Sequence, residues 1–146
     1  MIPHANSGTE ADAIWQLMVG LVWETRSEWR RNVANATGLP FSRARILWRL
    51  LDAPMTLKQI SDETGSDAPA TTVSVNDLED RGLVERHPHP ENRRAKLVSL
   101  TRAGKDMVDL IVDTVRDDAP PGFQHLSKTD LAHLRRILER VNRSEG

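Results

Sequence analysis

The 146-residue sequence contains no cysteine. Disulfide bonds, thiolate zinc sites and cysteine redox switches are therefore excluded. No window approaches about 18 uncharged apolar residues, so no membrane-spanning helix is predicted. The first residues, MIPHANSGTEADA, lack the basic start and the apolar run of a signal peptide. We therefore expect a cytoplasmic protein with no membrane partner.

Catalytic motifs are missing as well. The sequence has no Ser-His-Asp arrangement in a recognisable context, no phosphate-cradling glycine loop and no carboxylate pair outside a plain helical face. An enzyme is therefore not predicted, and no cofactor is expected. With 28% charged and 38% hydrophobic residues, the composition is typical of a globular protein. The length fits one folding unit.

Charge is unevenly distributed, although the net charge is only -1. The segment from Asp62 to Asp80 carries six acidic residues and no basic one. The balance reverses between Leu83 and Lys105, where six basic residues face two acidic ones. A nucleic-acid partner responds to such local clusters and not to the net charge.

Capping and periodicity signals predict a mainly α fold with a small β wing. Three helices are expected over residues 10–36, 42–52 and 56–64. A fourth is expected to start at a Ser66 or Asp67 cap and end at Gly82, a fifth to cover residues 101–117, and a last one to run from a Ser127 cap through Val141. The segments LVERH and AKLVSL are expected to be strands joined by the turn PHPENRR. Two short helices joined by a tight turn and followed by a hairpin outline a winged helix-turn-helix.

The first expected helix has an unusually wide apolar arc. Its apolar positions are Ile14, Leu17, Met18, Leu21, Val22 and Trp29, with Trp15, Val19 and Trp23 on an adjacent face. A helix that is apolar on more than one side must be covered on more than one side. Either its own chain or a second copy of it could provide that cover.

Residues 78–108 closely resemble the wing region of the MarR (multiple antibiotic resistance regulator) transcription factors. The matching elements are a leucine-acidic pair, Gly-Leu-Val-Glu-Arg, an acidic-polar-Arg-Arg tip, a Leu-Val-x-Leu-Thr return strand, and Gly-Lys three residues after that threonine. The helix order across residues 10–146 also agrees. The resemblance implies a homodimer, with residues 1–40 and 105–146 as dimerisation helices and residues 41–104 as the DNA-binding lobe.

The resemblance further implies a repressor that binds a pseudo-palindromic operator in double-stranded DNA and responds to a small aromatic effector. Candidate effector-binding residues are Trp15, Trp23 and Trp48, although packing in the core or the dimer is the plainer interpretation of these tryptophans. The alternative is a dimeric scaffold, or a small-molecule-binding protein of the same fold, with weak or no DNA binding. The acidic run from Asp62 to Asp80 leaves that alternative open.

In such a module the recognition helix lies in the major groove, where all four base pairs can be distinguished. Its expected exposed side chains are Ala70, Thr71, Thr72, Ser74 and Asn76. The family often places an arginine at the position of Val73, and this sequence has none. Recognition is therefore expected through hydroxyls, thymine-methyl contacts and a pairing of Asn76 with adenine.

The wing is expected to insert Arg93 and Arg94 into the narrow minor groove. Asn92 occupies the position of an aspartate that orients the arginine in the family, and Pro88 and Pro90 stiffen the turn. A plainer interpretation of the arginine pair is a solvated turn. The motif His87-x-His89 suggests a metal, but no cysteine or carboxylate pair supports one, and no metal is predicted. Further phosphate contacts are expected from three basic residues, Arg43, Arg45 and Lys58.

Overall fold

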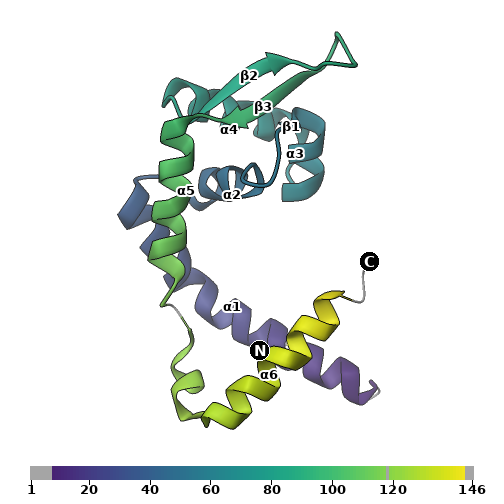
Figure 1. Ribbon diagram of the computed structural model, residues 1–146, viewed down its shortest axis with the longest axis vertical. Helices are drawn as coiled ribbons and strands as arrows, with labels where there is room; N and C mark the ends of the chain where they lie inside the picture. Colours follow the sequence, from purple (N-terminus) through teal and green to yellow (C-terminus); the bar gives the residue numbers. More distant parts are fainter. Residues whose placement is uncertain (1–7, 118, 144–146) are drawn as a thin grey trace. The chain divides into compact units, whose positions relative to one another are not determined.

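The computed structural model describes residues 8–117 and 119–143 (Figure 1). Its elements, in chain order, are α1 (Glu10–Thr37), α2 (Phe41–Arg49), β1 (Met55–Thr56), α3 (Leu57–Thr64), α4 (Ala68–Asp80), β2 (Val84–Pro88), β3 (Lys96–Leu100), α5 (Arg102–Val115), the 3-10 helix η1 (Pro121–His125) and α6 (Lys128–Arg143). The prediction of a mainly α fold with a small β wing is confirmed.

The chain divides into two compact units. Residues 26–117, here called the winged-helix lobe, contain the end of α1 and everything from α2 to α5. Residues 1–25 and 118–146, here called the helical unit, contain the first part of α1 together with η1 and α6. The end of α1 and the whole of α5 belong to the lobe. The assignment of residues 1–40 and 105–146 to dimerisation and of residues 41–104 to DNA binding stays a prediction. No helix of the described residues is long and apolar enough to cross a membrane.

Side-chain caps begin three helices of the lobe, as the sequence predicted. Thr56 and Gln59 form a complete capping box at α3, with Gln59 N donating to Thr56 Oγ1 at 3.2 Å and Thr56 N donating to Gln59 Oε1 at 2.8 Å. Asp67, and not Ser66, caps α4, since its Oδ1 accepts from the backbone of the third helical residue at 2.8 Å. Thr101 caps α5 in the same way. These local bonds fix where the two central helices of the lobe start.

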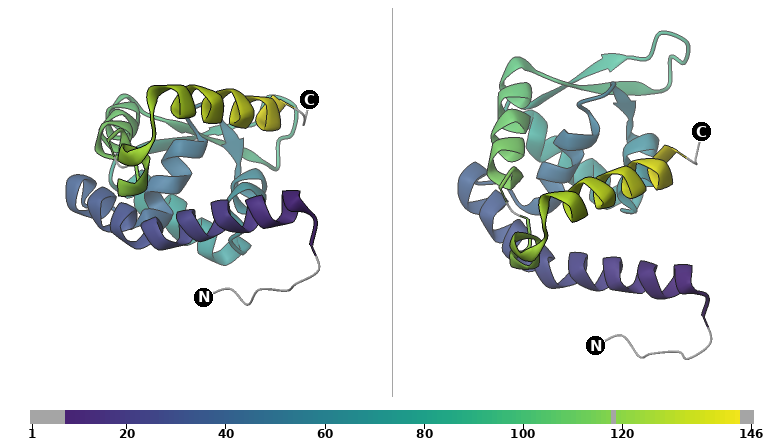
Figure 2. Two further views of the ribbon diagram at one scale, coloured as in Figure 1. Left: turned by 90° about the horizontal axis from the view of Figure 1, so that it is seen from below. Right: turned by 60° about the horizontal axis from the view of Figure 1, so that its bottom comes forward.

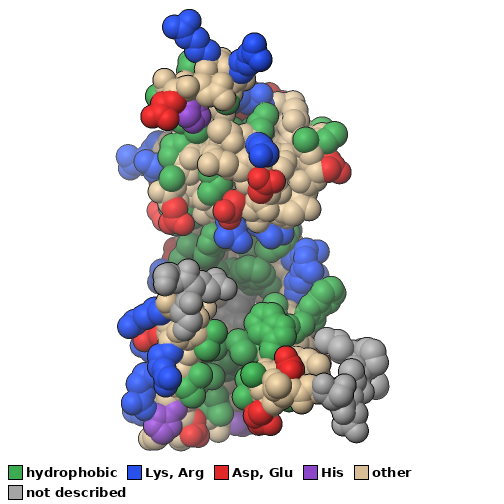
Figure 3. Space-filling model, turned by 90° about the vertical axis from the view of Figure 1, so that its right-hand side faces the viewer, with side chains coloured by type: hydrophobic (Ala, Val, Ile, Leu, Met, Phe, Trp, Pro, Cys, Tyr) green, Lys and Arg blue, Asp and Glu red, His purple; other side chains and the backbone are tan. Residues whose placement is uncertain are grey.

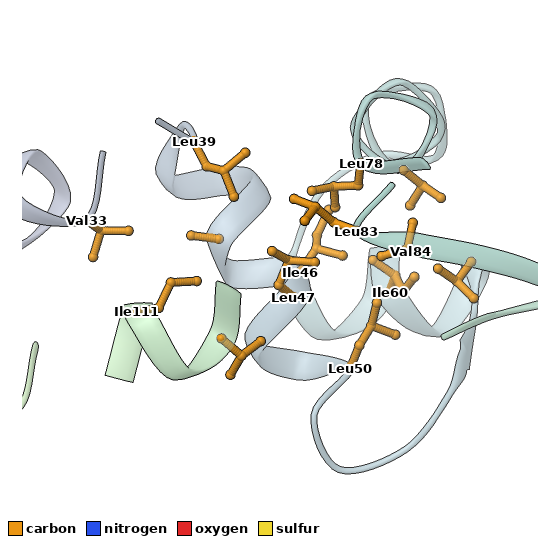
Figure 4. Close-up of a cluster of buried hydrophobic side chains, with 14 residues drawn as sticks. Val33, Leu39, Ile46, Leu47, Leu50, Ile60, Leu78, Leu83, Val84 and Ile111 are labelled. Atoms are coloured by element: carbon orange, nitrogen blue, oxygen red, sulfur yellow. The ribbon is translucent and has the colours of Figure 1, made fainter. Parts of the chain in front are cut away.

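The core of the lobe is aliphatic and draws on every helix of the lobe and on two strands (Figure 4). Full burial of one such side chain stabilises a fold by about 1.5–3 kcal/mol, so this cluster fixes how α2, α3 and α4 pack on each other. The cluster consists of Val33, Leu39, Ala44, Ile46, Leu47, Leu50, Ile60, Val75, Leu78, Leu83, Val84, Val98, Val108 and Ile111.

The three strands form one antiparallel sheet in the order β1-β3-β2. In the wing hairpin Val84 pairs with Leu100, and the ladder continues to Pro88 opposite Lys96. Strand β1 was not predicted, because two residues are too few to show a strand periodicity. Its residue Met55 pairs with Val98, so the sheet joins the segment just before α3 to the wing.

The wing is anchored at its base by Thr101 and Gly104. Thr101 Oγ1 donates to the carbonyl oxygen of Gly82 at 2.6 Å, and Thr101 N donates to that of Leu83 at 3.1 Å. A Cβ atom at position 104 would lie 2.0 Å from the same Leu83 oxygen. Only glycine fits there without a shift of the backbone, which gives the Gly-Lys element of the wing motif a physical cause.

The helical unit leaves many apolar side chains exposed (Figure 3). Leu17 is 75% exposed, and the unit buries no large apolar side chain among the residues described for it. Ser127 immediately precedes helix α6, and its Oγ accepts from Asp130 N at 3.1 Å, as predicted. The exposed apolar residues are Ile14, Trp15, Leu17, Met18, Leu21, Val22 and Trp23 on α1, Leu126, and Leu131, Ile137 and Val141 on α6.

Candidate nucleic-acid interface

Helices α3 and α4 are joined by a tight turn at Gly65, whose φ of 66° is left-handed. The exposed face of α4 carries Ala70, Val73 and Asn76, which recur every three residues, while Thr72 is half-buried beside them. Val73 is 60% exposed although it is apolar. This face is the part of α4 that an external partner can reach.

Two predicted base-contacting residues of α4 are buried, and the expectation that they are exposed is wrong. Thr71 is 1% and Ser74 7% exposed. Thr71 Oγ1 donates to the carbonyl oxygen of Asp67 at 2.9 Å and accepts from Ser61 Oγ at 2.8 Å, so it joins α3 to α4. Both positions lie on the helical stripe that also carries the core residue Leu78. That spacing of three and four residues was the signal that sequence reasoning missed.

The other two polar candidates of α4, Thr72 and Asn76, are exposed to different degrees and already bonded. Thr72 Oγ1 donates to the carbonyl oxygen of Ala68 at 3.0 Å, which leaves its lone pairs as acceptors. Asn76 is exposed, but its Oδ1 accepts a hydrogen bond from Arg86 of strand β2. The sequence gave no sign of this contact, because the two residues meet only when the wing folds against α4.

The tip of the wing presents Arg93 and Arg94 to solvent. The hairpin projects beyond the helices of the lobe (Figure 2), and basic side chains stand at its end (Figure 3). Asn92 Oδ1 accepts from Arg94 N at 3.1 Å, and Ala95 N donates to the Asn92 carbonyl oxygen at 3.1 Å. The Asn92 side chain thus orders the backbone of the tip and does not bond to the guanidinium of Arg94. No carboxylate of the described residues pairs with either arginine.

The two wing histidines bond separately. His87 Nε2 lies 3.1 Å from Glu85 Oε1, while His89 Nδ1 accepts from Glu91 N at 3.1 Å. Within residues 8–117 and 119–143, no group of three or more His, Asp or Glu side chains could hold a metal ion. His87 therefore bonds within β2, and His89 bonds at the start of the turn that follows it.

Arg43 is paired inside the lobe. Its Nε lies 3.3 Å from Asp77 Oδ2, and Arg81 Nε lies 3.1 Å from Asp77 Oδ1. The hydrogen bond from Arg81, helped by that from Arg43, holds the pKa of Asp77 below its usual 3.8 despite partial desolvation. The charge of Arg43 is thus compensated within the lobe, which makes it a weaker phosphate-binding candidate than exposed Lys58.

Arg45 lies beside a surface hollow of about 270 Å³. Arg30 also lines it, with its guanidinium carbon 4.9 Å from the centroid of the Phe41 ring. In the part of the chain that the structure describes, neither arginine pairs with a carboxylate. The remaining lining residues are Pro40, Ser42, Thr64 and Ser66.

The tryptophans Trp15, Trp23 and Trp48 do not line this hollow. All three are exposed, so the interpretation that they fill the core of one chain is wrong. Trp29 differs, since its ring packs 5.1 Å from that of Phe41. Packing between two copies and effector binding both stay open for the three exposed tryptophans.

Part of this chain is similar in sequence to a known protein family. Residues 37–95, which span α2 to the wing tip, match the family model described as MarR family. Over this range the chain is similar to the MarR family. It is also 27% identical over 104 residues to the HTH-type transcriptional repressor IacR of Pseudomonas putida. That match covers 70% of the chain and 62% of the repressor.

Solved structures show the same MarR-type fold. RV1404 from Mycobacterium tuberculosis superposes with a TM-score of 0.77 at 22% identity, covering 96% of this chain and 97% of that one. A mutant MarR from E. coli, crystallised in complex with operator DNA, gives a TM-score of 0.62 at 22% identity, covering 92% and 99% of the two chains. The winged helix-turn-helix architecture predicted from the sequence is therefore confirmed.

Proposed function

We propose that this chain is a MarR-family, sequence-specific DNA-binding transcriptional regulator. The observation that carries the proposal is a wing tip with two unpaired arginines on the same lobe as an exposed helix face. Helix α4 would lie in the major groove, with Thr72, Val73 and Asn76 facing the base edges and Val73 suited to a thymine methyl. Arg93 and Arg94 would enter the neighbouring minor groove.

Phosphate contacts would supply much of the affinity. Exposed Lys58 stands in the first turn of α3, and half-buried Arg45 stands in the middle of α2. Both are free to neutralise phosphates, whereas the acidic residues around α4 oppose binding. Binding of this kind weakens steeply with salt because condensed counterions are released.

A gel-shift titration across salt concentrations tests the proposal directly. Fragments of the source genome would serve as probes, and the selected fragment would then be titrated at rising ionic strength. We expect retention at low salt and a steep loss of affinity as salt rises. A dimeric scaffold without DNA binding would retain no duplex even at the lowest salt concentration, and that result would refute the proposal.

We further propose that the chain represses transcription as a homodimer. The matched relative is a repressor, and the E. coli neighbour was crystallised with operator DNA. The exposed apolar residues of α1 and α6 need cover, and each fully buried side chain stabilises by about 1.5–3 kcal/mol. A second copy would provide that cover and place two lobes on a pseudo-palindromic operator in the cytoplasm.

An effector would act by favouring one of two lobe spacings. A small aromatic compound that binds the non-operator spacing more tightly would release DNA in proportion to that difference in affinity. Exposed Trp15 and Trp23 make intrinsic fluorescence the natural signal. Titration with simple phenolic acids should quench it and lower operator retention together. Quenching without any change in retention would contradict the regulatory role.

A further inference from the structure

The contact between Arg86 and Asn76 determines what the recognition helix offers to a base. Arg86 lies on β2, opposite the buried Val98 of β3, so its backbone is firmly placed. Its Nη2 donates to Asn76 Oδ1, and its Nε lies 3.5 Å from Glu79 Oε2. Asn76 and Glu79 are three residues apart on one face of α4. One wing side chain therefore holds two side chains of the helix.

The chemistry of the two groups fixes how the amide of Asn76 is turned. A guanidinium has donors only, so the atom of Asn76 that faces it must be the carbonyl oxygen. The amino group of Asn76 is then the part left for an external partner, and it presents two donors. The Arg86 side chain is only 22% exposed, and its guanidinium is already engaged by Asn76 and Glu79, so Arg86 is poorly placed to reach a base.

This arrangement conflicts with the expected pairing of Asn76 with adenine. That pairing needs an acceptor for the N6 amino group and a donor for N7 at the same time. With its oxygen occupied, Asn76 offers only the donor half. Guanine presents two neighbouring acceptors in the major groove, N7 and O6, and so suits a donor-only group best.

We infer that Arg86 is a positioning residue that turns Asn76 into a reader of guanine. The inference rests on the proposed DNA-binding function and adds a specificity to it. It also accounts for a helix that has no arginine on its exposed face, because the donors that arginine usually offers to guanine come here from an asparagine held by the wing.

Selection of bound duplexes from a random library tests the inference. Wild type, Asn76→Ala, Arg86→Met and Arg86→Lys would be compared at one salt concentration. The position whose preference disappears in Asn76→Ala should carry guanine in the wild type. In Arg86→Met the ratio of adenine to guanine there should rise by about fivefold or more, because the freed oxygen completes the adenine pair. Lysine, also a pure donor, should restore guanine.

Two further variants separate positioning from folding. Arg116→Met removes an arginine that pairs with Asp113 at the far end of α5 and should leave the preference unchanged. Glu79→Gln keeps Arg86 but removes its carboxylate partner, so a partial shift towards adenine is expected even where Arg86→Met proves unstable. Thermal melting of each variant would show that it is folded.

A readout without DNA completes the test. The side-chain amide signal of Asn76 in a proton-nitrogen NMR spectrum should shift in Arg86→Met and stay in place in Arg116→Met. An unmoved signal, adenine at this position in the wild type, or an unchanged preference in Arg86→Met would each overturn the inference while DNA binding stands. Failure of the wild type to retain any duplex at low salt would instead refute the proposed function, and the inference with it.

Discussion

Replacing Arg94 by alanine should reduce both the affinity for operator DNA and its dependence on salt. Arg94 is exposed at the wing tip, and no described carboxylate pairs with it, so its removal breaks no ion pair within the lobe. Its backbone is held by Asn92, and that bond does not involve the guanidinium. The variant should therefore fold and assemble as the wild type does.

The size of the expected change in salt dependence follows from counterion release. Each phosphate neutralised by a cation contributes about 0.9 to the slope of log affinity against log salt. Two copies on one operator would lose two such contacts, so the slope should fall by about 1.8. Between about 50 mM and about 200 mM salt, the affinity deficit of the variant should then shrink about tenfold.

Gel-shift titrations of wild type and variant at several salt concentrations measure this slope. Arg116→Ala is the matched control, because it removes the same charge from the other end of α5. An affinity deficit that stays constant across salt would show that Arg94 makes no phosphate or groove contact. An unchanged affinity would remove the wing from the DNA-binding site altogether.

Three further outcomes follow from the structure. If the proposed dimer forms through the exposed face of α1, Leu17→Asp should convert it to a monomer in size-exclusion chromatography with light scattering, whereas Leu51→Asp in the lobe should not. Gly104→Ala should lower the free energy of unfolding by about 1–3 kcal/mol through overpacking, whereas Gly20→Ala, where a Cβ meets nothing within 4 Å, should raise it by about 0.5–1 kcal/mol. Because the folded pKa of Asp77 lies below 3.8, its contribution to stability should be complete above that pH and lost below it. In urea unfolding, Asp77→Asn should therefore have a lower free energy of unfolding than the wild type at neutral pH, and this difference should become smaller in acid. A difference in the free energy of unfolding that does not change with pH would contradict this reasoning.

Local signals in the sequence were enough for most of the fold. Thr56, Asp67 and Thr101 cap helices through bonds to residues three positions away, so their roles are visible in a short stretch of sequence. Strand β1 was invisible because it has only two residues and acquires its identity from β3. The wide apolar arc of α1 left open whether its own chain or a second copy covers it, and within the described residues its apolar side chains are largely exposed.

The candidate site was harder to predict because it depends on tertiary contacts. Thr71 and Ser74 are polar and were taken for exposed residues, although their spacing from Leu78 places them on the buried stripe. The position of Arg86 beside Asn76 depends on how β2 folds onto α4, ten residues along the chain. The exposure of the wing tip could be predicted, since a turn between two strands is exposed wherever the strands pair, and Ala70 and Asn76 are exposed on α4 as expected.

The two ends of the wing are held by separate sets of bonds. At the base, Thr101 and Gly104 close on the Leu83 carbonyl, where even one added methyl group has no room. At the tip, backbone bonds and Asn92 order the turn without using the side chains of Arg93 and Arg94. Changes at these two arginines therefore leave the folding of the hairpin almost untouched. Substitutions at these two positions would therefore change the proposed minor-groove contact of the lobe while its fold stays constant.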